Sequence, residues 1–451
     1  MLVAIAATRA SAQTTTCQLI AQPSTHTNTI PFNNQSITFA GGGVLVRCPA
    51  RGITLKGDSA EQYPDRWYMV GHVNYAEPRF TLQSSFLTYY PADERIVASG
   101  DVHAALPNGS TLVGPQAVYL RAVPRLRSAA QMTAIGRPTI TVIQKDSTGK
   151  PQPPLSVLAD RVFMNGDSLM YGSGRVILQR EDLSANGDSV FLDSGRETMR
   201  LMRNPQLIGK RNRPFQLRGS VIDAYSKNRK LQRVIARDSA VAVSQDLTLT
   251  ADTIDLRVDN DLLQHAYAWG AKTRSTAKSP TQNLVADSID VDMPKQRVRT
   301  VRAFNRAFAQ GKADTVRFRA EPPDTTDWLR GDTILAHFDT LPPKDTTKAP
   351  DIRQLEANGK ASAMYHVAVS DTSVHKPAIN YVRAKHIVID FDSQKVALVT
   401  ARDSVVGLYV EPAPDSTKAR GTTTPTPGKP GAPQPAPKLP TSTVPLPRRK
   451  P

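Results

Sequence analysis

Aspartate recurs along the chain in a pattern that could do chemistry, because a row of carboxylates can bind calcium or hydrolyse a polysaccharide. The recurring residues are Asp58, Asp160, Asp188, Asp252, Asp287 and Asp332. The chain lacks the glycine-rich nonapeptide of calcium-binding β-rolls. One aspartate in about every 30 residues is more typical of a residue that begins or caps a turn. We therefore expect this aspartate ladder to have a structural role.

Other catalytic chemistry finds little support in the sequence. The eight histidines are scattered and never have the His-x-His or His-Glu-x-x-His spacing of metal sites. No phosphate-binding loop, dinucleotide-binding fingerprint or complete nucleophile motif occurs. The sequence therefore predicts a protein that is not an enzyme and needs neither a cofactor nor a metal. An exported enzyme that acts on polysaccharides is the remaining enzymatic alternative.

The first residues resemble a secretion signal. The apolar run Leu2–Ala7 precedes Ala-Ser-Ala at 10–12, which has the small-x-small pattern of a cleavage site. We expect a signal peptide over 1–12, with a disordered terminus as the alternative. Cys17 and Cys48 are the only cysteines, and in an oxidising compartment we expect them to form a disulfide rather than remain free thiols.

Charge is unevenly distributed along the chain. The 57 Lys and Arg outnumber the 40 Asp and Glu, which gives a net charge of +17. Residues 412–451 are rich in proline and have no apolar period, so we expect a disordered basic tail there. Positive charge favours acidic partners such as lipid headgroups, and it is the only feature that favours nucleic acid. Because the secretion signal argues against nucleic acid, we expect no such partner.

Strand-like segments dominate between these two ends. They are short, rich in β-branched residues, and separated by Gly, Asn, Asp and Pro. Ala251–Val258 is echoed by Ala286–Met293, and a polar turn and a second apolar strand follow each, as at Leu263–Thr273. Such a unit of about 30 residues, repeated without helices, implies β-units that bury a continuous core only by stacking on their neighbours. We predict an all-β, elongated body over 13–411.

Alternation inside each unit predicts one apolar face and one wet face. Ile254 and Leu256 lie on one side of their strand, and Asp255 and Arg257 lie on the other. The apolar face could fill an ordinary core or line a slot for aliphatic chains. In the second case the lipid-binding residues are Val162, Met164, Val190, Leu192, Ile254, Leu256, Ile289, Val291, Ile334 and Phe338.

These repeats resemble the OstA-like family, the periplasmic lipopolysaccharide-transport proteins that include the soluble LptA-type bridge. The resemblance is carried by Gly52–Tyr75, Leu249–Ser275 and Leu284–Phe304. Each has an Ala-Asp-x-apolar strand or a close variant, a short turn, and an apolar strand with small residues. The chain is about twice as long as a soluble bridge. Its body is therefore either one unit or two slabs, over about 36–200 and 215–411.

The resemblance implies an antiparallel β-jellyroll, or β-taco, that is open along one seam and holds acyl chains in a groove. It implies a periplasmic protein that carries lipopolysaccharide or a similar acylated glycolipid toward the outer membrane. Its partners would be OstA-like proteins of the inner and outer membranes. The alternative is a structural or adhesive envelope protein whose interior is filled by its own side chains. A continuous open groove would favour transport, and a filled interior would favour the scaffold.

Both ends of such a stack would expose an unpaired strand, which can pair with another sheet. Ile37–Cys48 at one end has three glycines and few charges. Ile387–Phe391 and Val396–Val410 at the other end are strongly β-prone and have no proline before Pro412. We therefore expect head-to-tail pairing with further copies or with OstA-like partners.

Overall fold

The computed structural model describes residues 17–33, 35–143, 148–210, 213–312, 326–339, 349–367, 377–393 and 395–412. Within these residues the regular structure consists of β-strands and two short 3₁₀ turns. The predicted all-β, elongated fold is therefore confirmed. The expected signal peptide over 1–12 lies outside the described residues, and so does the expected tail after Pro412.

The strands follow one another in a single antiparallel sheet. The first fifteen are β1 (Gln18–Ile20), β2 (His26–Phe32), β3 (Gln35–Cys48), β4 (Ile53–Gln62), β5 (Trp67–Glu77), β6 (Phe80–Tyr90), β7 (Arg95–Ala105), β8 (Thr111–Leu120), β9 (Gln131–Ile135), β10 (Thr139–Val142), β11 (Leu155–Leu158), β12 (Arg161–Asn165), β13 (Leu169–Gln179), β14 (Leu183–Asp193) and β15 (Thr198–Met202). The next fifteen are β16 (Gln206–Gly209), β17 (Phe215–Arg218), β18 (Val221–Lys227), β19 (Lys230–Val243), β20 (Thr248–Asp259), β21 (Leu262–Trp269), β22 (Ser275–Lys278), β23 (Gln282–Ala286), β24 (Ser288–Asp292), β25 (Thr300–Lys312), β26 (Thr326–Phe338), β27 (Ile352–Val367), β28 (Ala378–Asp392), β29 (Lys395–Arg402) and β30 (Val406–Val410). The 3₁₀ turns are η1 (Pro49–Arg51) and η2 (Pro294–Gln296).

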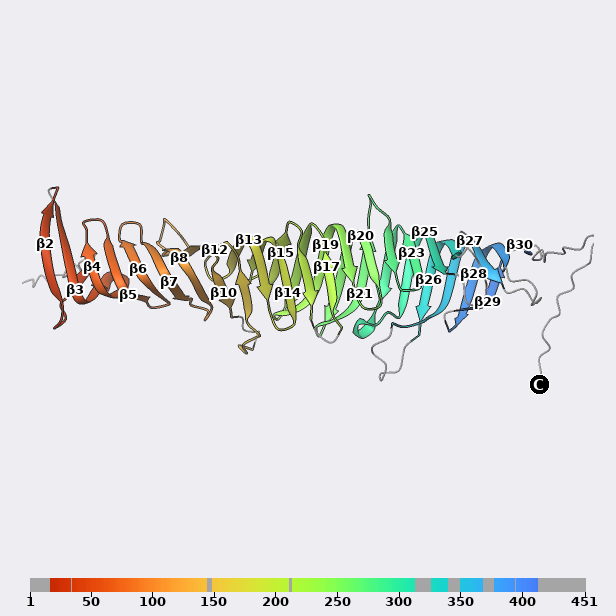
Figure 1. Ribbon diagram of the computed structural model, residues 1–451, viewed down its shortest axis with the longest axis horizontal. Helices are drawn as coiled ribbons and strands as arrows, with labels where there is room; N and C mark the ends of the chain where they lie inside the picture. Colours follow the sequence, from red (N-terminus) through yellow and green to blue (C-terminus); the bar gives the residue numbers. More distant parts are fainter. Residues whose placement is uncertain are drawn as a thin grey trace, which may run out of the picture.

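The sheet is folded lengthwise into two arms. In β3, residues 35–41 pair with β2 and residues 45–47 pair with β1. A bulge lies between Gly41 and Val44, in the pairing of β3 with β4. The other long strands have a bulge at the same level, so each of them bends there. Elsewhere two short strands take the place of one long strand, and the loop between them makes the bend. The strands lie across the long axis of the molecule and follow one another from one end to the other (Figure 1).

We call the two halves arm A and arm B. Arm A contains β2, β9, β12, β15, β18, β21, β24 and β29, and arm B contains β1, β10, β11, β16, β17, β22, β23 and β30. Each remaining strand has one half in each arm. The bends form one long edge, and the turns of the two arms face each other along the opposite edge, which we call the seam. This is the expected β-taco, hinged on one edge.

The bends depend on left-handed residues held by aspartates. In β13 the bend lies at Gly174 and Arg175, whose φ angles are 76° and 46°. A Cβ on Gly174 would lie 2.5 Å from Oδ2 of Asp160, so only glycine permits this approach. Arg175 Nη2 donates to Oδ1 of Asp160 at 2.7 Å, and Arg137 Nη1 donates to it at 3.0 Å. These hydrogen bonds hold the pKa of Asp160 below its usual value.

The rest of the aspartate ladder lies at the same edge. Each member contacts a residue at the bend of the next strand. The pairs are Asp58 with His72 at 2.8 Å, Asp188 with Arg203 at 3.1 Å, Asp252 with the Lys272 N–H at 2.7 Å, and Asp287 with Arg306 at 2.7 Å. Asp332 lies beside Gly359, where it would meet any added Cβ. The structural role expected for the ladder is therefore confirmed.

One hydrophobic core runs between the arms along the length of the sheet. It extends from Ala40 to Ile389 and includes Leu201, Leu207 and Phe215. The pairing of β16 with β17 and the shared core residues thus join the described residues on both sides of the point where a division into two slabs would fall. The described body is one continuous unit.

The two ends of the stack differ. At the first end, β1 and β2 both cover β3, and the expected disulfide between Cys17 and Cys48 is present. The sequence predicted that Ile37–Cys48 is the terminal strand at this end. That prediction is wrong, because the short strands β1 and β2 pair along the outer edge of β3. At the other end β29 and β30 are the last strands, as expected, and Val406 is 67% exposed.

Candidate functional site

The ten predicted lipid-binding residues all come from arm A. Nine lie on its inner face, with exposed fractions between 0% and 8%, and Phe338 is half-buried beside the same core. They are Val162 and Met164 on β12, Val190 and Leu192 on β14, Ile254 and Leu256 on β20, Ile289 and Val291 on β24, and Ile334 and Phe338 on β26. The alternation in the sequence therefore identified the interior face correctly. Whether these residues bind lipid remains a prediction.

Side chains from arm B fill the middle of the interior. Leu178, Leu217 and Leu249 are between 0% and 2% exposed and belong to the same core as the arm A residues. Cavities found along this stretch each have volumes of about 50 Å³ or less. The seam is also bridged here, because Asp246 of arm B accepts a hydrogen bond from the Val298 N–H of arm A at 3.3 Å. An acyl chain could enter this stretch only if the arms moved apart.

The interior widens at the C-terminal end. A cavity of about 600 Å³ lies between the arms there, within the range of about 300–1,000 Å³ typical of ligand pockets. Its apolar walls include Leu355, Ile389 and Val399 from arm A and Leu329 and Val367 from arm B. The sequence assigned apolar strands to this region but did not single these residues out.

Polar groups are placed at the arm B side of this cavity. His366 is 7% exposed, and its Nδ1 lies 2.7 Å from Oδ1 of Asp327. Tyr365 accepts a hydrogen bond from Asn380 Nδ2 at 2.9 Å, and burial raises the pKa of Tyr365 although this hydrogen bond lowers it. Lys312 also borders the cavity. A chamber whose lining combines apolar side chains with polar groups, a cation among them, suits a molecule with an aliphatic and an anionic part.

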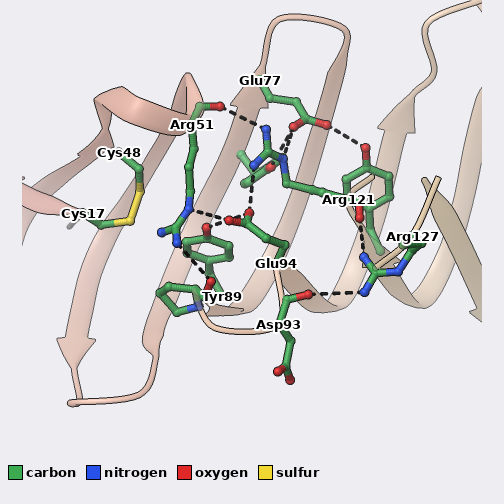
Figure 2. Close-up of polar contacts among 12 residues, drawn as sticks. Cys17, Cys48, Arg51, Glu77, Tyr89, Asp93, Glu94, Arg121 and Arg127 are labelled. Carbon is green, nitrogen blue, oxygen red and sulfur yellow. Dashed lines mark hydrogen bonds and ion pairs between the residues drawn. A yellow bond between two sulfur atoms is a disulfide. The ribbon is translucent and has the colours of Figure 1, made fainter. Parts of the chain in front are cut away.

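The seam is closed in the N-terminal third by a group of charged residues. Arg51 and Glu77 belong to the turns of arm B, and Glu94 and Arg121 belong to those of arm A (Figure 2). Arg121 forms ion pairs with Glu77 and with Glu94, the latter at 2.8 Å, and Arg51 also pairs with Glu94. Burial lowers the pKa of Arg121, but its hydrogen bonds with the two glutamates outweigh burial and raise it. We call these four residues the seam clasp.

Tyrosines connect the clasp to the core. Tyr119 donates a hydrogen bond to Oε1 of Glu77 at 2.6 Å, and Tyr89 donates to Oε2 of Glu94 at 3.2 Å. Tyr75 also donates to Glu77, at 3.3 Å. Burial first, and the nearby glutamates second, raise the pKa values of the three tyrosines. They therefore remain protonated donors, which satisfies carboxylates that are largely removed from water.

The outer face of arm A is less exposed to solvent than its sequence suggests. Asp255 is only 5% exposed, because Arg233 and Arg257 cover it with hydrogen bonds of 2.7 and 3.2 Å. Asp223 is covered in the same way by Arg200, which donates to it at 2.6 Å, and by Arg237. The sequence placed Asp255 and Arg257 on this face correctly but gave no sign of these cross-strand ion pairs.

Neither a protein family model nor a curated protein matches the chain significantly. Among the described residues, no group of three or more His, Cys, Asp or Glu side chains is arranged to hold a metal ion. The same residues contain no helix with the length and apolarity needed to span a membrane.

Proposed function

We propose that this protein is a periplasmic bridge that carries lipopolysaccharide or a similar acylated glycolipid toward the outer membrane. The observation that supports this proposal best is the apolar interior between two hinged arms, which ends in a cavity of about 600 Å³. Acyl chains would lie between the arms, and the sugars and phosphates would remain in water. The resemblance of the repeats to the OstA-like family supports the same function.

The physical chemistry of the interior fits such a cargo. Removing an acyl chain from water is worth about 0.8 kcal/mol per CH₂ group, and aliphatic walls supply this without specific polar contacts. The fold needs no catalytic group for carriage, so the proposed protein is not an enzyme. The disulfide Cys17–Cys48 supports an oxidising compartment such as the periplasm.

A second function is favoured by the tight packing of the middle. The filled interior and the clasped seam are what a structural or adhesive envelope protein would have. In the transport proposal the same packing means that lipid first occupies the C-terminal cavity. It advances only where the arms separate, and each separated unit exposes apolar side chains that the lipid then covers.

The last strands provide a route to partners. Leu398 on β29 and Leu408 on β30 are 58% and 60% exposed, and each strand pairs with β28 on one side only among the described residues. We propose that these edges accept strands of OstA-like proteins of either membrane, or of further copies of this chain. Val399→Pro should weaken this pairing with a partner strand. Because Val399 also lines the cavity, the pairing is measured by analytical ultracentrifugation and not by bound lipid.

Lipid carriage can be tested on protein purified from envelopes under native conditions. Native mass spectrometry should detect lipid A-containing species bound to the wild-type chain. Val399→Asp, which places a charge in the cavity wall, should reduce bound lipid. Val113→Asp is the matched control, because Val113 is 43% exposed on distant β8. A folded wild-type protein that never carries lipid, and takes up none when mixed with lipopolysaccharide, would favour the scaffold.

A further inference from the structure

Aromatic, aliphatic and arginine side chains gather on the outer face of arm B at its C-terminal end. Trp328, Met364, Tyr381 and Leu408 lie opposite one another across β26, β27, β28 and β30, and Arg330, Ser362, Arg383 and Val406 form the next row. These side chains point outward, because the alternating residues Leu329, Ala363 and Val382 are buried in the core. We call Phe308, Trp328, Arg330, Tyr381, Arg383, Val406 and Leu408 the terminal patch.

The patch is held together by ring contacts. The ring centroids of Trp328 and Tyr381 are 6.0 Å apart. The Arg330 guanidinium lies 4.9 Å from the Trp328 centroid and 5.0 Å from that of Phe308. Val406 and Leu408 add two aliphatic side chains that are 67% and 60% exposed. Phe308, Trp328 and Tyr381 are half-buried, so the rings and the two exposed aliphatic side chains form a partly exposed apolar surface. Contiguous apolar surface of this kind is typical of contact sites.

The charge of the patch has a single sign. Neither Arg330 nor Arg383 forms an ion pair with a described residue, and neither row contains an Asp or Glu. Of the nearby carboxylates, Asp327 is hydrogen-bonded to His366, and Asp332 lies at the bend beside Gly359 and forms no ion pair with either arginine among the described residues. The two guanidinium groups are therefore available to an anionic partner.

We propose that the terminal patch docks on an anionic lipid membrane surface. Tryptophan, tyrosine and arginine suit the headgroup level of a membrane, where an apolar body and a polar end are both accommodated. Leucine and valine side chains can enter the acyl boundary, and the arginines meet lipid phosphates. A protein partner would also favour Trp, Tyr and Arg, but its surface would have to be uniformly acidic to match a patch without carboxylates.

Docking would bring the C-terminal cavity to the membrane. Trp328 of the patch and Met364, its neighbour in the same row, also border the cavity, so the two features adjoin. The inference goes beyond lipid carriage and does not require it, since a scaffold protein could dock by the same face. A chain that binds vesicles but carries no lipid would retain the docking proposal and overturn carriage.

Tryptophan quenching tests where the chain meets a membrane. The three tryptophans are Trp67, 4% exposed in the core, Trp269 on arm A, and Trp328 in the patch. The full-length protein is mixed with vesicles of phosphatidylglycerol and phosphatidylcholine that carry brominated acyl chains. We expect quenching of fluorescence that disappears in Trp328→Phe and persists in Trp269→Phe. Quenching that is unchanged by Trp328→Phe would overturn the proposal.

Charge variants test the role of the two arginines. Each basic side chain near an anionic surface contributes roughly fivefold to binding, so Arg330→Gln with Arg383→Gln should weaken vesicle binding about 25-fold. Arg161→Gln with Arg353→Gln removes the same charge from arm A and is the matched control, because both side chains are exposed. The two double variants have the same net charge, so the contribution of the other basic residues to vesicle binding is the same in both. Equal weakening by the two pairs, or binding only to another protein, would overturn the proposal.

Discussion

Removing the guanidinium of Arg121 should release the seam of the N-terminal third. In Arg121→Met, Glu77 loses its ion pair although its side chain is only 9% exposed, and Glu94 loses one of its two. The Arg51 carbonyl also loses the hydrogen bond that Arg121 Nη2 donates at 3.0 Å. Removing one partner of a buried ion pair costs about 3–5 kcal/mol, because a buried charge is left uncompensated.

This cost should appear locally rather than along the whole stack. In a repeat architecture each unit contacts only its neighbours, so a weakened clasp opens nearby strands and leaves distant ones unchanged. Each 1.4 kcal/mol is a factor of ten, so amide exchange in β5 to β8 should accelerate by roughly a hundredfold to a few thousandfold. Exchange in β25 to β28 should not change. Hydrogen exchange with mass spectrometry measures both regions in one experiment.

A matched arginine variant separates the clasp from a general effect of charge. Arg66 pairs with Asp65 at 3.1 Å on the surface, where their side chains are 37% and 62% exposed. Such exposed pairs are worth about 0–1 kcal/mol, so Arg66→Met should barely alter exchange. If Arg121→Met left exchange in β5 to β8 unchanged, or accelerated it equally at both ends, the clasp would not be what closes the seam.

Three further outcomes are expected. Burial raises the pKa of Asp223, but its hydrogen bonds with Arg200 and Arg237 outweigh burial and lower the pKa. The stability that this carboxylate contributes is therefore present above its unfolded pKa of about 3.9 and is lost as the pH falls below that value. Asp223→Asn should remove that part of the acid dependence in unfolding curves between about pH 2 and 6, and an unchanged curve would contradict the assignment. Reduction of Cys17–Cys48, which are 31 residues apart, should cost about 3.7 kcal/mol in the chain-entropy model. It should also expose to exchange those backbone amides of 45–47 that face β1; protection that survives reduction would mean that β1 is held by packing alone. In an alkaline absorbance titration, the three clasp tyrosines should ionise only at pH values above about 10, where exposed tyrosines ionise, because their pKa values are raised; full ionisation of all tyrosines near pH 10 in the folded protein would contradict their burial.

The repeating part of the fold could be predicted because it depends on the residue pattern within each strand. A period of two within each strand identifies the buried side, as with Ile254 and Leu256, and it needs no knowledge of the partner strand. The aspartate ladder was predictable for a similar reason, since Asp160 and the bend at Gly174 belong to one unit.

The features of the candidate functional site depend on contacts between units and between arms. Glu77 and Arg121 come from opposite arms and are 44 residues apart, so the period does not reveal which turns meet across the seam. The volume of the C-terminal cavity depends on how far the two arms diverge, and no single residue determines that. Asp255 was misjudged as a wet residue because the arginine that covers it most closely, Arg233, belongs to the previous strand.

Unequal closure of the seam gives the proposed bridge a direction. At the N-terminal third, a cargo would have to break ion pairs of Arg121 and Arg51 that are largely removed from water. In the middle it would have to displace core side chains and the hydrogen bond between Val298 and Asp246. At the C-terminal end a chamber of about 600 Å³ is already present, bounded by strands that have only one neighbour among the described residues. In the proposed bridge, exchange of a lipid would therefore cost least at the end formed by β29 and β30, and passage toward β1 would require the arms to separate one unit after another.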